Sequence, residues 1–140
     1  MKFEASQFTP TQFSTAADKA KFANHFVRFV ESGFKITLFP KWFYTRLSNT
    51  FGHIAHYNQG GFFDAQCSTA RAQHSFLRQC ASYPCYGQPE HTYCDVEKVL
   101  AKWIRDSGRI ETTATAIRLG QEAAERNELS RLKAKYEVAP

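Results

Sequence analysis

The sequence has no apolar run that approaches the roughly 18 residues needed for a membrane-spanning helix. Its first ten residues also lack the apolar core of a secretory signal, so we expect a cytoplasmic protein that does not enter membranes. The composition argues against disorder of the whole chain, because hydrophobic residues make up 43% and charged residues 22% of the 140 residues. This apolar content can offset the entropy lost on folding, and we predict a single domain over residues 1–140.

Common enzyme motifs are missing as well. The chain has no glycine-rich phosphate loop, no G-x-S-x-G nucleophile elbow and no evident pair of catalytic carboxylates. These absences favour a protein that is not an enzyme and uses no cofactor. One alternative stays open, because His53 and His56 lie three residues apart in GHIAHYN. On a helix this pair could hold a metal ion, or one imidazole could act as a general base beside Tyr57, although the pattern lacks the glutamate of H-E-x-x-H.

The cysteines form no C-x-x-C pair, which is the usual ligand spacing in zinc ribbons and fingers. Four cysteines are present, separated by 12, 4 and 8 residues. We expect them to be reduced, buried thiols. A mixed Cys/His zinc site that includes His74 or His91 remains an alternative. The four residues are Cys67, Cys80, Cys85 and Cys94.

The chain also lacks a run of consecutive basic residues, which excludes a polybasic tail. Lys and Arg still outnumber Asp and Glu by 18 to 13, giving a net charge of +5 and a pI of about 9.1. Residues 33–63 contain Lys35, Lys41 and Arg46 and no acidic residue at all. A basic protein of this kind is compatible with nucleic acid or another acidic partner.

Apolar residues recur with the period of an α-helix through most of the chain, whereas strand-like alternation is confined to FKITLF at residues 34–39. A lone strand has nothing to pair with, so we interpret that segment as an extended connector. The sequence therefore predicts an all-α, single-domain bundle of four to five helices. The predicted helices cover residues 15–32, 40–57, 64–81, 92–107 and 110–136.

The two ends of the chain differ from the predicted bundle. Residues 1–15 carry Phe3, Phe8 and Phe13 at intervals of five, which fits neither a helix nor a strand, so we expect an irregular arm that packs on the body or on a partner. Residues 110–136 are rich in good helix formers but have only a thin apolar stripe. This last helix should lie on the surface or project from it.

The predicted helix over residues 40–57 carries the candidate binding site. Its polar and ring-bearing residues follow one another at steps of 4, 3, 4, 3 and 1, so an unbroken helix would align them on one ridge beside the core. A guanidinium for phosphates, aromatic platforms for bases and an amide for polar contacts would then share one surface. The candidate residues are Trp42, Arg46, Asn49, His53, His56 and Tyr57.

The sequence thus predicts a small basic binding protein that presents this ridge to an acidic macromolecule, either a nucleic acid or a protein that itself binds nucleic acid. Two alternatives remain. One is a metal- or histidine-dependent enzyme built on His53 and His56. The other is an inhibitor or assembly factor that acts through the N-terminal arm and the C-terminal helix. The sequence leaves open whether the chain forms a homo-oligomer.

Overall fold

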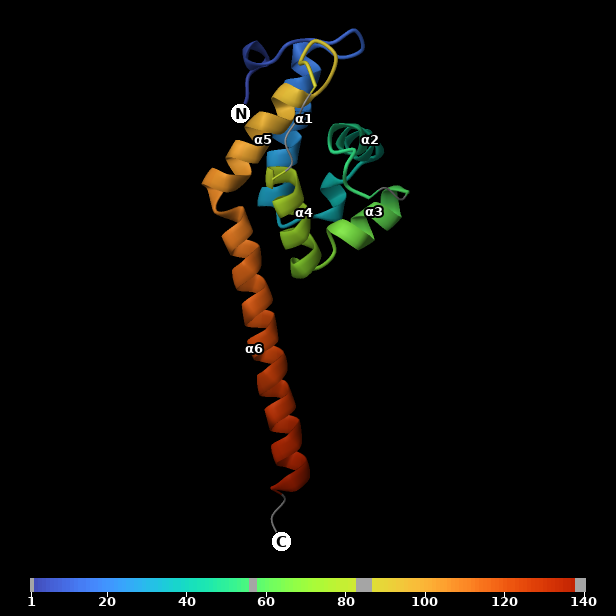
Figure 1. Ribbon diagram of the computed structural model, residues 1–140. Helices are drawn as coiled ribbons and strands as arrows, with labels where there is room; N and C mark the ends of the chain where they lie inside the picture. Colours follow the sequence, from blue (N-terminus) through green and yellow to red (C-terminus); the bar gives the residue numbers. More distant parts are fainter. Residues whose placement is uncertain (1, 56–57, 83–86, 138–140) are drawn as a thin grey trace.

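A computed structural model describes residues 2–55, 58–82 and 87–137 (Figure 1). Over these residues the chain forms six α-helices, two short 3-10 helices and no strand. The all-α class is therefore confirmed, while the helix count exceeds the predicted four to five. The helices are α1 (Ala16–Glu31), α2 (Lys41–Thr50), α3 (Gln59–Gln66), α4 (Ala70–Ser82), α5 (Cys94–Ser107) and α6 (Arg109–Tyr136), and the 3-10 helices are η1 (Ala5–Gln7) and η2 (Ile36–Leu38).

Helix α1 forms the centre of an aromatic core. Thr15 caps its first turn by accepting a hydrogen bond from the Asp18 N–H, and the Asp18 carboxylate accepts the Thr15 N–H in return. The phenylalanines of α1 are buried, and the ring of Phe26 contacts those of Phe51 and Phe76 with centroids 5.9 and 6.2 Å apart. Such ring pairs add to the hydrophobic stabilisation that comes from burial.

The predicted helix over residues 40–57 is wrong in its length, because α2 ends at Thr50. Phe51 leaves the helical region with φ −108° and ψ 56°, and its N–H closes the helix on the Leu47 carbonyl. Phe51 and Ile54 are both only 1% exposed, so the turn that follows α2 delivers two apolar side chains to the core without continuing the helix. The apolar residues at helical spacing are buried as predicted, but the last two of them lie in the turn after α2 and not in the helix.

The predicted helix over residues 64–81 is in fact parts of two helices. Asn58 starts α3 early by accepting the Gly61 N–H at 2.7 Å. Helix α3 then ends at Gln66, and the Thr69 hydroxyl accepts the Ala72 N–H at 3.1 Å at the start of α4. Local caps of this kind divide a segment whose composition alone suggests one helix.

A buried lysine fastens the segment before α5 to α1. The Lys19 side chain is 0% exposed, and its ammonium donates to the Pro89 carbonyl at 2.8 Å and to the Thr92 carbonyl at 2.9 Å. The same ammonium pairs with the Asp95 carboxylate at 2.9 Å. Asp95 also accepts the Thr9 N–H at 3.0 Å, so one carboxylate ties the N-terminal segment to both helices.

The N-terminal segment lies along α1 and is not wholly irregular, because it contains η1. Phe3 and Phe8 are buried, while Phe13 is 88% exposed. The side chain of Asn24 accepts the Phe3 N–H at 3.0 Å and donates to the Phe3 carbonyl at 2.9 Å. This segment therefore forms a wall beside the exposed face of α1.

Helix α6 begins at Arg109, directly after Gly108, whose φ of 74° allows the sharp change of direction after α5. Its first turns pack on α4, with Thr113 buried. From Arg118 onward almost every residue is exposed, and the helix extends away from the other five (Figure 1). None of the helices in the described part of the chain is both long and apolar enough to cross a membrane.

Candidate functional site

The end of α2 at Thr50 divides the predicted ridge. Trp42, Arg46 and Asn49 lie on α2, and His53 lies in the turn after it. His56 and Tyr57 are outside the described residues. The six residues therefore do not line up along one continuous helix, and the correction follows from the backbone of Phe51.

Arg46 and His53 both contact neighbouring elements. The Arg46 guanidinium lies 4.6 Å from the ring centroid of Tyr93, which is buried, so Arg46 stacks at the contact between α2 and the start of α5. His53 Nε2 lies 3.4 Å from the Gln79 carbonyl of α4. Asn49 is exposed. These positions give Arg46 and His53 packing roles in addition to any contact with a ligand.

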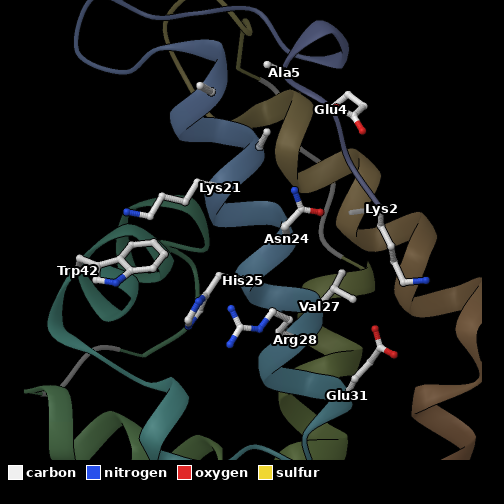
Figure 2. A pocket seen from close by; sticks show the side chains of 12 residues that line it. Lys2, Glu4, Ala5, Lys21, Asn24, His25, Val27, Arg28, Glu31 and Trp42 are labelled. Atoms are coloured by element: carbon white, nitrogen blue, oxygen red, sulfur yellow. The ribbon is translucent and has the colours of Figure 1, made fainter.

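Trp42 remains accessible, with 39% of its surface exposed, and it forms one wall of a groove along α1 (Figure 2). The Lys21 ammonium lies over the indole, 4.5 Å from its centroid. The His25 ring contacts the indole edge-on, with centroids 4.8 Å apart. A large aromatic surface, a cation and an imidazole thus meet at one place.

The groove has a volume of about 620 Å³ and lies between α2 on one side and the N-terminal segment on the other. Its charged side chains come from α1 and the N-terminal segment. Of the two acidic side chains, Glu31 pairs with Arg109 at 3.7 Å. No carboxylate within the described part of the chain is close enough to pair with Lys21 or Arg28. The charged lining residues are Lys2, Glu4, Lys21, Arg28 and Glu31.

His25 is held in one orientation at the base of this groove. Its Nε2 lies 2.8 Å from the Leu38 carbonyl, which only accepts hydrogen bonds, so Nε2 carries the hydrogen and Nδ1 is left as an acceptor. Burial lowers the pKa of His25 below its usual 6.5, the hydrogen bond to Leu38 opposes this effect, and the nearby charges of Arg28 and Lys21 add to it. The imidazole is therefore neutral at neutral pH.

The sequence contained a signal for this groove that the reasoning about residues 40–57 missed. Lys21, His25 and Arg28 follow one another at steps of four and three, so they form a single row on α1 beside its phenylalanine stripe. Sequence alone did not show that Trp42 of α2 would stand beside this row, because that contact is tertiary.

The described cysteines are not placed for catalysis or metal binding. Cys67, Cys80 and Cys94 are buried free thiols. Burial raises the pKa of Cys67 to about 12 and raises the pKa of Cys80 well above its ordinary value, so both stay protonated at neutral pH. Cys85 is outside the described residues, and among those described no three His, Cys, Asp or Glu side chains gather into a metal site.

The groove beside Trp42 offers cationic donors and an aromatic surface, which suit noncovalent binding of an anionic partner. His25 is the imidazole among its described lining residues, and no described carboxylate or thiol pairs with it to activate a nucleophile. Comparison with known proteins finds no matching family model, no similar curated protein and no similar solved structure.

Proposed function

We propose that the protein binds an acidic macromolecule, specifically a nucleic acid with unpaired bases, through the groove beside Trp42, and that it does so without catalysing a reaction. The observation that carries this proposal is the half-exposed indole of Trp42 with the Lys21 ammonium above it. Arg28 lies farther along the same row and has no carboxylate partner among the described residues. Stacking surfaces flanked by cations are typical of proteins that bind single-stranded nucleic acid.

In this proposal an unpaired base stacks on the indole while the phosphates next to it contact the cations. Lys21 has a flexible side chain, so its ammonium can leave the ring face and move to a phosphate when a base arrives. Arg28 can offer two parallel N–H donors to a second phosphate. The groove volume of about 620 Å³ lies within the usual range for small-ligand sites, which is enough for one nucleotide unit.

The indole favours a nucleic acid over an acidic protein surface. Carboxylates would pair with Lys21 and Arg28 but would leave the ring of Trp42 without a stacking partner. A base uses both the ring and the cations, and each stacked base contributes about 1–3 kcal/mol. The neutral His25 beneath adds no charge, so selectivity for phosphates comes from the Lys and Arg side chains.

The test is titration of the whole chain into a fluorescently labelled single-stranded oligonucleotide at several salt concentrations. Trp42→Ala should weaken binding by about 5- to 150-fold, as expected for the loss of one stacked base. Lys21→Ala should weaken it and reduce the slope of log K against log salt by about 0.7, the value for one phosphate contact in a single strand. Ile36→Ala and Lys98→Ala are matched controls, because both residues are exposed outside the groove, and both should bind like the wild type.

The proposal is overturned if the wild type does not bind the oligonucleotide, or if Trp42→Ala binds it equally well while melting like the wild type. Binding of a partner protein that survives Trp42→Ala but is lost on removal of residues 125–140 would also overturn it. That result would favour a protein-assembly role for the exposed part of α6, where Leu129 and Leu132 are accessible.

A further inference from the structure

A second basic groove lies between α4 and α6, apart from the one beside Trp42. It has a volume of about 490 Å³, and α6 contributes Ile117 to its lining. The other lining side chains that the structure describes come from α4 and are polar or basic. These side chains are Arg71, His74, Ser75, Arg78, Gln79 and Ser82.

The spacing of these residues makes a straight row of donors. Arg71, Ser75, Arg78 and Ser82 follow one another at steps of 4, 3 and 4, so they share one face of α4. At 1.5 Å per residue the row is about 16 Å long, and its two arginines start about 10 Å apart along the helix axis. Guanidinium and hydroxyl groups therefore alternate along the groove.

The row carries positive charge that no carboxylate of the described residues neutralises. Arg71 and Arg78 are exposed, and neither forms an ion pair with a carboxylate of the described chain. At the end of α4, Arg105 donates to the Ala81 carbonyl at 2.8 Å and adds a further guanidinium. The sequence around the row is also poor in acid, since Asp64 is the one acidic residue between Glu31 and Glu90.

The hydrogen bonds of His74 fix which of its two ring nitrogens carries the hydrogen. Thr113 Oγ1 donates to the Ile110 carbonyl at 2.7 Å, so it accepts from His74 Nδ1, which lies 3.0 Å away. Nδ1 therefore carries the hydrogen and Nε2 is an acceptor in this tautomer, so the donors that the groove offers to an anion are its guanidinium and hydroxyl groups. Ser75 Oγ accepts from the Gln79 amide at 3.2 Å, which leaves the serine hydroxyl hydrogen free to donate.

We propose that the groove between α4 and α6 is a second nucleic-acid contact, which binds successive phosphate groups of the sugar–phosphate backbone. The proposal rests on the function proposed above for the class of partner, and it adds the site at which the backbone is held. The two arginines start about 10 Å apart along the helix axis, which is farther than one phosphate group reaches, so each would hold a different phosphate of the same strand. A single phosphate would use one end of the row, whereas a polymer of phosphates matches its whole length. Among the described residues no Phe, Tyr or Trp ring lines this groove, so we assign it to the backbone and not to the bases.

The test compares Arg71→Gln/Arg78→Gln with the matched control Arg126→Gln/Lys133→Gln, which removes two exposed charges from α6 outside the groove. Binding of a labelled single-stranded oligonucleotide is measured across a range of salt concentrations. The groove variant should lower the slope of log K against log salt by about 1.4, or about 0.7 for each lost contact. Arg78→Gln alone should lower the slope by about half as much, and the control should leave it unchanged. All these positions are exposed, so the melting temperatures should match that of the wild type.

Equal slopes for the groove variant and the control overturn this second contact, and they leave the proposal for Trp42 standing if Trp42→Ala still weakens binding. A reduced slope in the groove variant together with normal binding by Trp42→Ala supports the groove between α4 and α6 and overturns the site beside Trp42. Inorganic phosphate provides the last comparison. Suppose that inorganic phosphate displaces the oligonucleotide from the wild type at the concentration at which phosphate alone binds the protein, and that it does not do so in the groove variant. The groove then binds isolated anions, and its assignment to the nucleic-acid backbone is wrong.

Discussion

Replacing Lys19 by methionine tests the contact that joins α1 to the segment before α5. Methionine keeps an unbranched chain of similar length but removes the ammonium, which donates to the Pro89 and Thr92 carbonyls and pairs with Asp95. Removal of one partner from a buried ion pair costs about 3–5 kcal/mol, because the other charge is left without compensation. Asp95 keeps 17% exposure and still accepts the Thr9 N–H, which places the expected loss near the lower end, at about 3 kcal/mol.

Urea denaturation followed by circular dichroism measures this loss directly. A destabilisation of about 3 kcal/mol should lower the melting temperature by about 10 °C for a chain of this size. Lys98→Met is the matched control, because Lys98 is exposed on α5, and its free energy of unfolding should change by less than about 0.5 kcal/mol.

The Lys19–Asp95 pair also predicts how two substitutions combine. Asp95→Asn removes the carboxylate charge, so the double variant Lys19→Met/Asp95→Asn should lose less stability than the sum of the single variants, with a coupling of at least about 1 kcal/mol. A loss below about 1 kcal/mol in Lys19→Met, or strictly additive effects of the two changes, would refute the reasoning that this ammonium holds the two segments together.

Two further predictions concern the core and the base of the groove. Phe26→Ala should lose about 3–5 kcal/mol of unfolding free energy, because the ring is 0% exposed. Phe13→Ala is the control, and it should change the free energy of unfolding by less than about 0.5 kcal/mol, because Phe13 is 88% exposed. Equal losses for the two variants in chemical denaturation would contradict this packing. Burial lowers the pKa of His25, so as the pH falls the unfolded chain takes up a proton near pH 6.5, before the folded chain does. The contribution of neutral His25 to the free energy of unfolding should therefore be fully present above that pH and decrease below it. His25→Gln should lessen this fall in denaturation curves between pH 7 and 5, and identical pH profiles for the two proteins would count against it.

The helical class was predictable because apolar side chains repeat with the helical period over most of the chain. Phe22, Phe26 and Phe29 follow one another at steps of four and three, which puts them on one face of a helix, and all three are at most 1% exposed. The end of α2 was not predictable from the same pattern, since Phe51 and Ile54 keep the spacing of a helix after the helix has ended. The burial of these two side chains in the core outweighs the local preference for a helix, which is small because the residues around Gly52 are weak helix formers.

The candidate site was predictable only in part, for a related reason. Trp42 was identified from its place beside the core stripe of α2, and it does line a groove. The cations beside it come from α1, and no local pattern in the sequence joins the two helices. Lys19 was missed although it precedes Phe22 by three residues and Phe26 by seven, a spacing that places it on the buried face of α1. A charged residue on such a stripe signals a buried ion pair, whose partner only the tertiary fold reveals.

The long final helix affects how the molecule will behave in solution. Its 28 residues form a rod of about 42 Å, and from Arg118 to Tyr136 about 28 Å of that rod has no neighbouring element to support it. A rod attached to a rounded body increases friction and makes tumbling anisotropic. A monomer of 16.0 kDa should therefore elute from a gel-filtration column ahead of globular standards of equal mass. Early elution is thus no evidence for a dimer, and light scattering or sedimentation equilibrium, which do not depend on shape, is the appropriate measure of its mass.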